Sequence, residues 1–177
     1  MGLLGRLRKR KPVIDDREGM VFGIGVDEDS LEEAREAGKE DGEKWKPKPN
    51  LPPPFIATMR ARVTAAMRAK AAESGRTCEG YARQAWRLIE GSKNGNHAAL
   101  RLQLRDFDGE IDEFDADVKT GTEFMHELES VYLQVAQPLW AKRQVKWRIE
   151  EFQVPEFLVK ERAELLELKS AADDRHR

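Results

Sequence analysis

Apolar residues recur every three or four positions along most of the chain after residue 54, which is the spacing of amphipathic helices. The pattern predicts a first helix that begins near Phe55 and ends at Ser74 and Gly75. A second helix is predicted over about residues 77–90, and a third over about residues 97–107. The apolar face of the first helix consists of Ile56, Met59, Val63, Ala66 and Met67.

The last third of the chain predicts further helices. Thr122 is placed to cap a long helix, and Pro138 is expected to kink or break it. The continuation of that helix is predicted to run to Phe152 and to carry two tryptophans on one face. Pro155 is placed to open a last helix, whose heptad-like stripe consists of Leu158, Leu165, Leu168 and Ala172.

The first 54 residues lack this pattern and predict an extended arm. A basic tip precedes the apolar run from Val21 to Val26, which is expected either to form one short strand or to lie extended on a partner. An acidic helix is predicted over about residues 31–43, with Ser30 and Glu33 as its capping box. Because few apolar residues anchor that helix, we expect it to be marginal by itself. A proline-rich linker that ends at residue 54 completes the arm.

We therefore predict an all-α fold with two parts, an extended N-terminal arm over residues 1–54 and a bundle of four or five helices over residues 55–177. The single cysteine, Cys78, cannot form an internal disulfide, so this fold does not depend on an oxidising compartment. No stretch approaches the ~20 apolar residues of a membrane span, and no run near the N-terminus suits a signal peptide. We expect a cytoplasmic protein, or a virion component if the chain is viral.

The charged residues make up 36% of the chain and are sorted into blocks of alternating sign, although the net charge is only −2. Residues 1–11 carry five bases and no acids, and residues 12–43 carry twelve acids against three bases. Residues 44–105 carry thirteen bases against three acids, and residues 106–130 carry ten acids against one base. We expect blocks of opposite sign to neutralise one another, within the chain or between copies.

The basic block over residues 44–105 makes nucleic-acid binding the runner-up function, because arginine and lysine on a helical face can contact phosphates. Against this interpretation, the acidic blocks compete for the same face. The glycine-rich connector over 91–95 is also longer than the turn of a helix-turn-helix motif. In this interpretation the acidic arm covers the basic face of the unbound protein. The candidate residues are Arg60, Arg62, Arg68, Lys70, Arg76, Arg83 and Arg87.

Acidic residues around Gly109 resemble part of an EF-hand calcium loop. With Gly109 at the sharp turn, Asp106 and Asp108 take the third and fifth ligand positions. Leu104 at the first position cannot bind a cation, and Asp115 takes the twelfth position in place of a bidentate glutamate. An acidic turn is the favoured interpretation, and a calcium-dependent regulator is the lesser alternative.

Two other patterns are incomplete versions of known sites. Gly23 and Gly25 follow an apolar run, but Glu28 stands where a dinucleotide-binding loop requires its third glycine. Glu123 and His126 have the spacing of a di-iron ligand pair, but the sequence contains no second Glu-x-x-His. We predict no cofactor and no metal site.

Covalent catalysis by Cys78 needs a histidine base, for which His97 and His126 are the candidates. A position near a helix N-terminus would lower the pKa of this thiol, although a lone helical cysteine more often packs. Trp140 and Trp147 alternate with basic residues, and packing into the core is favoured over contact with a membrane surface or a protein groove. Because no catalytic motif is complete, we predict that the chain is not an enzyme.

The leading hypothesis is a structural or adaptor subunit of a larger assembly, because contacts with neighbouring protein subunits, of the same or another chain, best explain such an arm. The first ten residues are similar to the start of some portal proteins of bacterial viruses. This resemblance implies a head or connector component of a virion. The partner-binding candidates are Leu3, Leu7, Val21, Phe22, Ile24 and Val26 in the arm, and Leu158, Leu165 and Leu168 in the last helix.

Overall fold

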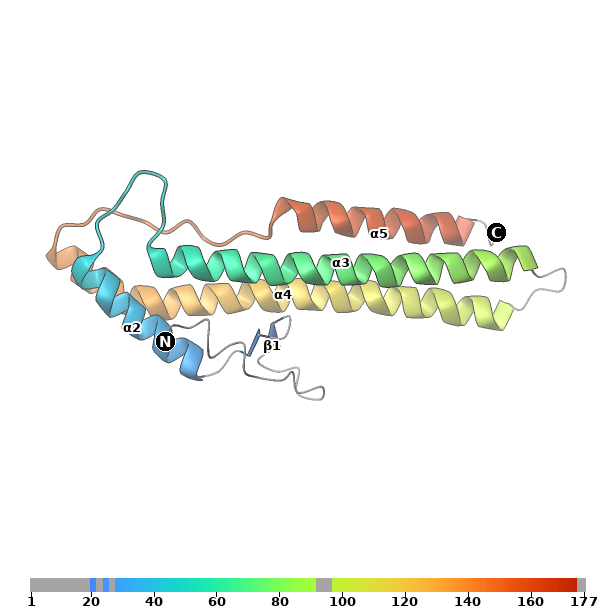
Figure 1. The fold of residues 1–177 in the computed structure, drawn as a ribbon, viewed down its shortest axis with the longest axis horizontal. Helices are drawn as coiled ribbons and strands as arrows, with labels where there is room; N and C mark the ends of the chain where they lie inside the picture. Colours follow the sequence, from blue (N-terminus) through green and yellow to red (C-terminus); the bar gives the residue numbers. More distant parts are fainter. Residues whose placement is uncertain (1–19, 22–23, 26–27, 92–96, 175–177) are drawn as a thin grey trace. The chain divides into compact units, whose positions relative to one another are not determined.

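The computed structural model describes residues 20–21, 24–25, 28–91 and 97–174. The predicted all-α class is confirmed, with four helices in these residues (Figure 1). In place of the one short strand predicted within 21–26, two short strands pair antiparallel as a hairpin. The elements are β1 (Met20–Val21), β2 (Ile24–Gly25), α2 (Glu28–Lys44), α3 (Pro54–Gly91), α4 (His97–Lys142) and α5 (Glu156–Asp174).

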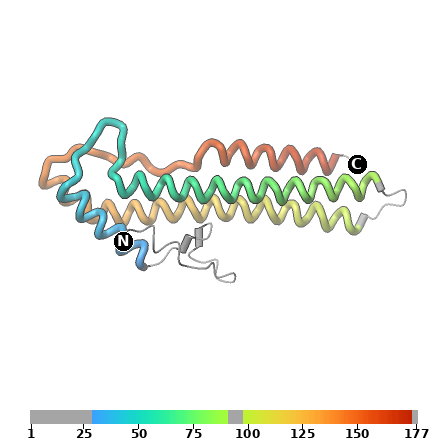
Figure 2. The backbone as a smooth tube through the Cα atoms, in the orientation of Figure 1, coloured from blue at the N-terminus to red at the C-terminus, as the bar shows by residue number. Residues whose placement is uncertain are grey.

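α3 is one uninterrupted helix, so the predicted end at Ser74 and Gly75 is wrong (Figure 2). Ser74 is fully buried and stands between Ala71 and Cys78 in a line of buried small residues, which continues the apolar face past the expected break. A glycine inside a helix costs about 1 kcal/mol relative to alanine, and the packing of this face outweighs that cost. The helix predicted over 77–90 is therefore the second half of α3.

α4 joins three segments that the sequence pattern had separated, namely the helix over 97–107, the acidic segment and the helix expected to start at Thr122. The acidic segment is helical because Phe107, Ile111 and Phe114 recur at helical spacing and are 0%, 5% and 1% exposed. Their burial against the rest of the chain makes the segment an amphipathic helix. Thr122 consequently lies in the interior of α4 and does not cap it.

Pro138 lies inside α4 and does not break it, and the helix ends at Lys142. The predicted helical continuation to Phe152 is therefore wrong, because the residues that follow α4 are not helical until α5 begins at Glu156. Pro155 directly precedes α5, as predicted.

A Schellman motif ends α4. The Val145 N–H donates to the Trp140 carbonyl at 2.9 Å, and the Gln144 N–H donates to the Ala141 carbonyl at 3.2 Å. Gln144 has a φ of 58°, in the left-handed region where glycine is the usual residue. Because glutamine occupies this position, the sequence carries no glycine signal for the end of the helix.

The contacts within the chain divide it into two units. Unit 1 comprises the described residues up to Ala66 together with Lys119–Gln153, and unit 2 comprises Met67–Val118 together with the described residues from Val154 onward. α3 and α4 each contribute to both units, whereas α2 belongs to unit 1 and α5 to unit 2. The acidic helix of the predicted arm therefore makes its contacts within unit 1.

A line of small residues holds α2 against α4. Ala34, Gly38 and Gly42 follow one another at intervals of four residues and are all buried. A Cβ atom on Gly38 would lie 2.6 Å from the backbone oxygen of Tyr132, and one on Gly42 would lie 2.6 Å from Leu139 Cδ1. At Gly38 the obstacle is backbone, so only glycine permits this approach. Close backbone packing thus anchors a helix that has few large apolar residues.

Hydrogen bonds join the C-terminal end of α2 to α4 and to Arg143, the residue that follows α4. The Tyr132 hydroxyl donates to Asp41 Oδ2 at 2.7 Å. Arg143 donates to the carbonyls of Gly42 at 2.7 Å and Trp45 at 2.9 Å, which satisfies oxygens that have no partner within the helix. Burial raises the pKa of Asp41, and the hydrogen bond from Tyr132 opposes that shift.

Three tryptophans pack together in unit 1. The ring centroid of Trp45 lies 5.4 Å from that of Trp140 and 5.3 Å from that of Trp147, and the last two lie 5.4 Å apart. Trp140 is 2% exposed, and its Nε1 donates to the Asp41 carbonyl at 3.1 Å. Core packing of Trp140 is therefore confirmed. Trp147 reaches the cluster from the non-helical segment after α4, so the two rings do not share a helical face.

In unit 2, α4 runs antiparallel to both α3 and α5. Two clusters of buried side chains show this. From the first cluster to the second, the residue numbers rise along α3 and α5 and fall along α4. The first cluster contains Cys78, Ala82, Phe107, Ile111 and Leu165, and the second contains Ala85, Leu100 and Ala172.

Ion pairs join the basic block of α3 to the acidic block of α4. Lys70 Nζ in unit 2 lies 3.4 Å from Asp117 and 3.7 Å from Glu113. Burial disfavours the charged ammonium of Lys70, but the nearby carboxylates outweigh this effect and raise its pKa. The blocks therefore neutralise one another within the chain, as predicted, and residues 106–130 supply the acidic partner.

Gly38→Ala is expected to lower the free energy of unfolding by about 1–3 kcal/mol, because the added Cβ overlaps the Tyr132 backbone oxygen. Gly109→Ala is the matched control, since nothing lies within 4 Å of its Cβ position in α4. It is expected to raise the free energy of unfolding by about 0.5–1 kcal/mol through helix propensity. Urea denaturation followed by far-UV circular dichroism measures both values. Equal gains at the two positions would contradict the close contact of α2 with α4.

Gln144→Gly is expected to raise the free energy of unfolding by about 1 kcal/mol, because glycine adopts the left-handed conformation without a Cβ clash. Gln134→Gly, at an exposed position inside α4, is the control and is expected to lower it by about 1 kcal/mol. The same denaturation curves give both numbers. A loss of stability in Gln144→Gly as large as that of the control would show that α4 does not end in this way.

Candidate functional site

The predicted partner-binding leucines of the last helix lie on its inner face. Leu158 and Leu165 are 2% and 3% exposed, and Leu168 packs against the cluster around Cys78. The prediction of a packing stripe is correct, but the surfaces that it contacts are those of α3 and α4 in the same chain. Leu158 and Leu165 are therefore covered by the chain itself in this structure, and Leu168 is half-buried.

The predicted arm anchors fall largely outside the described residues. Neither the backbone nor the side chain is described for four of them: Leu3, Leu7, Phe22 and Val26. The backbones of Val21 and Ile24 pair with each other in the hairpin, and their side chains are not among those described.

Two ion pairs with α4 hold α5 in a fixed rotation within unit 2. Arg162 forms a bidentate salt bridge with Asp115 of α4, in which Nε donates to Oδ1 at 2.8 Å and Nη2 donates to Oδ2 at 3.0 Å. Lys169 forms an ion pair with Asp108, which lies about two helical turns before Asp115 on α4. These pairs determine which face of α5 turns away from α4.

The outer face of α5 carries a second apolar stripe. Val159 and Leu166 are 60% and 40% exposed, whereas their neighbours Leu158 and Leu165 are buried. Ala163 and Ser170 are also exposed, and the four outer positions follow one another at intervals of four, three and four residues. We call Val159, Ala163, Leu166 and Ser170 the outer stripe. Exposed apolar residues at helical spacing on a firmly held helix are typical of a protein-binding surface.

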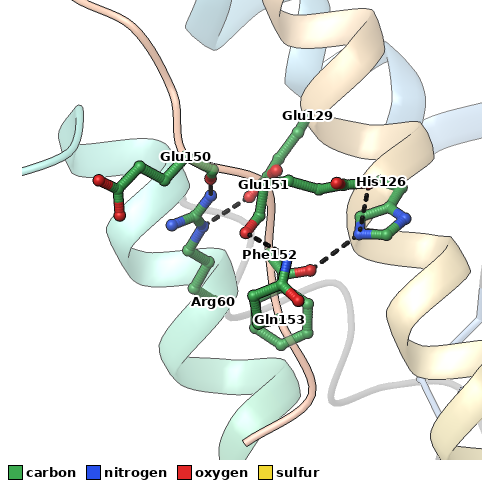
Figure 3. Close-up of polar contacts among 7 residues, drawn as sticks. All are labelled: Arg60, His126, Glu129, Glu150, Glu151, Phe152 and Gln153. Carbon is green, nitrogen blue, oxygen red and sulfur yellow. Dashed lines mark hydrogen bonds and ion pairs between the residues drawn. The ribbon is translucent and has the colours of Figure 1, made fainter.

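A polar junction in unit 1 holds the non-helical segment after α4 (Figure 3). Arg60 of α3 forms an ion pair with Glu129 of α4, from Nε to Oε1 at 2.6 Å, and it also donates to the Glu150 carbonyl. Glu129 is only 4% exposed, so this arginine supplies the partner that a buried carboxylate requires. His126 Nε2 lies 2.9 Å from the Phe152 carbonyl, which can only accept, so this nitrogen carries the proton.

Two open clefts flank this junction within unit 1. One has a volume of about 360 Å³ and is lined by residues of α4 from His126 to Gln137 and by Ile149 and Glu151 of the segment after α4. The other has a volume of about 370 Å³ and includes Arg60 and Trp147 in its wall. The charged groups Arg60 and Glu129 are already bound to each other, and His126 already bonds the Phe152 carbonyl. The geometry therefore assigns these three residues to holding the segment in place.

The residues predicted to bind nucleic acid do not form one free basic surface. Arg60 and Lys70 are paired with carboxylates of α4, and the Arg68 guanidinium lies 4.0 Å from the ring centroid of Phe157. Arg62 is half-buried. The remaining three candidates are exposed along the second half of α3: Arg76, Arg83 and Arg87.

Cys78 does not have the properties of a nucleophile. It lies in the interior of α3, far from the helix N-terminus, and it is 0% exposed. Burial, together with the negative charges of Glu110 and Glu161, raises the pKa of its thiol to about 12. The predicted lowering of this pKa is therefore wrong, because the continuous α3 removes the helix start that would have caused it.

The calcium-loop hypothesis is also contradicted. Residues 104–115 lie inside α4, where a helix cannot wrap its side chains around a cation as an EF-hand loop does. Asp108 and Asp115 instead bind the cations of α5. In the described part of the chain, no group of three or more histidine, cysteine or acidic side chains is placed to hold a metal ion.

No protein-family model, curated protein or solved structure matches this chain. Among the helices of the described residues, none combines the length and the apolar character needed to cross a membrane.

Sequence reasoning missed the outer stripe because α5 has two apolar faces that differ by one residue in register. Leu158 and Leu165 repeat at seven residues, and so do Val159 and Leu166. The heavier leucine content favoured the first face as the partner-binding one. The hydrophobic pattern alone does not say which of two such faces the chain itself covers.

Cys78 is expected to react with a thiol reagent such as Ellman's reagent at pH 8 only after unfolding, because the folded thiol is buried and protonated at that pH. The rate of modification is measured in buffer and in concentrated urea. Ser170→Cys is the control, since its exposed thiol should react rapidly in the folded protein. Rapid reaction of the unmutated folded protein would contradict the burial of Cys78.

Proposed function

We propose that this chain is a non-enzymatic structural or adaptor subunit of a larger macromolecular assembly. The observation that carries the proposal is the outer stripe of α5, which exposes Val159 and Leu166 on a helix that is already packed on its other side. A helix with apolar anchors at positions i, i+4 and i+7 is the usual element in helix-mediated recognition. Complete burial of an aliphatic side chain of this size stabilises a complex by about 1.5–3 kcal/mol.

The rigid seating of α5 supports this role. The two-pronged bond from Arg162 to Asp115 and the ion pair from Lys169 to Asp108 hold the helix before any partner arrives. A surface that is ordered in advance loses less conformational entropy when it binds. The Leu158 and Leu165 contacts in the core add to this order.

A head or connector component of a bacterial virus is the specific form that we favour. Its basis is the similarity of the first ten residues to the start of some portal proteins, which lies in the sequence and outside the described residues. The virion and the cytoplasm of its host are the corresponding locations.

Nucleic-acid binding is the second candidate function. It is favoured by Arg76, Arg83 and Arg87, which are exposed along α3 at intervals of seven and four residues and so share one side of the helix. The ion pairs of Arg60 and Lys70 with α4 leave fewer cations for this role than the sequence suggested.

The double variant Val159→Ser/Leu166→Ser is expected to release the chain from its assembly. Sedimentation of an extract of the producing cells, with the tagged chain detected by antibody, is the measurement. The unchanged chain should sediment well ahead of the monomer, and the double variant should shift to the monomer position. Leu102→Ser is the matched control, because Leu102 is 50% exposed on α4 and lies off the outer stripe.

Sedimentation of the unchanged chain as a monomer in the extract would overturn the proposed function. A fast-sedimenting species that nuclease or high salt dissolves, and that survives the double variant, would favour the nucleic-acid function instead.

A further inference from the structure

We propose that the partner of the outer stripe is the outer stripe of a second copy of this chain, with the two α5 helices antiparallel. This inference rests on the proposed function and names the partner of the same surface. The intervals of four, three and four residues between Val159, Ala163, Leu166 and Ser170 are those of the contact seam between two packed helices.

The sizes of the four side chains favour the antiparallel direction. In an antiparallel pair centred on the stripe, Val159 faces Ser170 of the second copy, and Leu166 faces its Ala163. Each large side chain then meets a small one, and all layers have similar volume. In a parallel pair each residue faces its own copy, so the Ala163 and Ser170 layers would be underfilled. Complementary volume therefore selects one orientation.

The charges along one edge of the stripe favour the same direction. Lys160 and Glu167 lie along one edge of the stripe, seven residues apart, and both are exposed. An antiparallel pair sets Lys160 of each copy near Glu167 of the other, which makes two symmetric ion pairs. In a parallel pair this edge would face the other edge of the second copy, so Lys160 would have no acidic partner there and Glu167 would lie near Arg162, which is already bound to Asp115. The pairing of Lys160 with Glu156 at 3.2 Å is a solvent-exposed contact that costs little to exchange.

Along the other edge an antiparallel pair sets Arg162 near Lys169 of the second copy, and at the two ends it sets Glu156 near Asp173, so these like charges weaken the pair. Arg162 and Lys169 on the other edge are already paired with Asp115 and Asp108 of α4. The next seam positions at either end are acidic residues, so the apolar contact is limited to the four positions of the stripe. A seam of about three turns is shorter than a standard stable interface. We therefore expect a dimer that depends on protein concentration.

Sedimentation equilibrium of the purified full chain tests the inference. The weight-average mass should rise from one chain toward two, with a dissociation constant on the order of tens of micromolar for so short a seam. The rise should persist in high salt because the seam is apolar, and Val159→Ser/Leu166→Ser should abolish it. Leu102→Ser should leave it unchanged. A monomer at all accessible concentrations would overturn the inference.

Charge variants test the orientation. Lys160→Glu and Glu167→Lys should each weaken self-association by about three- to tenfold at low salt, because each sets like charges together across the pair. An equimolar mixture of the two variants should recover the affinity, since every cross-pair is then opposite in sign. Circular dichroism of each variant checks that the fold is kept. Mixtures no tighter than the separate variants would contradict the antiparallel contact.

Cysteine pairs give an independent measure of direction. Val159→Cys mixed with Ser170→Cys should form a disulfide-linked dimer under mild oxidation, and Val159→Cys alone should not. Ready linkage of Val159→Cys to itself would show a parallel pair and overturn the inference. A monomeric purified chain whose assembly in the extract still depends on Val159 and Leu166 would mean a different partner, and the proposed function would stand without this inference.

Discussion

The acidic residues of α4 bind cations of α3 in both units and of α5 in unit 2. In unit 2, Asp117 and Glu113 bind Lys70 of α3, while Asp115 binds Arg162 of α5. In unit 1 the buried Glu129 binds Arg60. A buried or half-buried ion pair adds little net stability, but the loss of one partner is costly because the other is left without compensation. These pairs therefore act mainly by selecting one register of the helices, and the face that α5 presents to solvent follows from that register.

The sequence was sufficient for the fold class and for most of the helical residues. The repeat of apolar positions in Ile56, Met59 and Val63 predicts one face of α3, and those residues are buried. The breaks were less predictable, since Gly75 and Thr122 are common at helix ends and yet lie inside α3 and α4. Local propensities of about 1 kcal/mol are smaller than the packing energy of a continuous apolar face, so tertiary contacts decide these positions.

The candidate site was only half predictable. The sequence predicts an apolar repeat in α5. Which of the two apolar faces of α5 is exposed depends on the ion pairs of Arg162 and Lys169 with α4, and these form only when the helices pack together. The docking of α2 was missed for a related reason. In a sequence, a glycine such as Gly38 indicates a weaker helix. Only the structure shows that Gly38 lets the backbone of α2 approach the backbone of α4.

The three neighbouring tryptophans of unit 1 give the protein an intrinsic fluorescence signal that reports on this unit. Trp45, Trp140 and Trp147 lie within 5.3–5.4 Å of one another between ring centroids, so excitation passes readily among them and they emit as a group. The fourth tryptophan, Trp86, belongs to unit 2. Replacing Trp86 with phenylalanine would leave an emission spectrum that reports on unit 1 alone. Intrinsic fluorescence can then show whether the two units lose their structure together or in sequence, without any added dye.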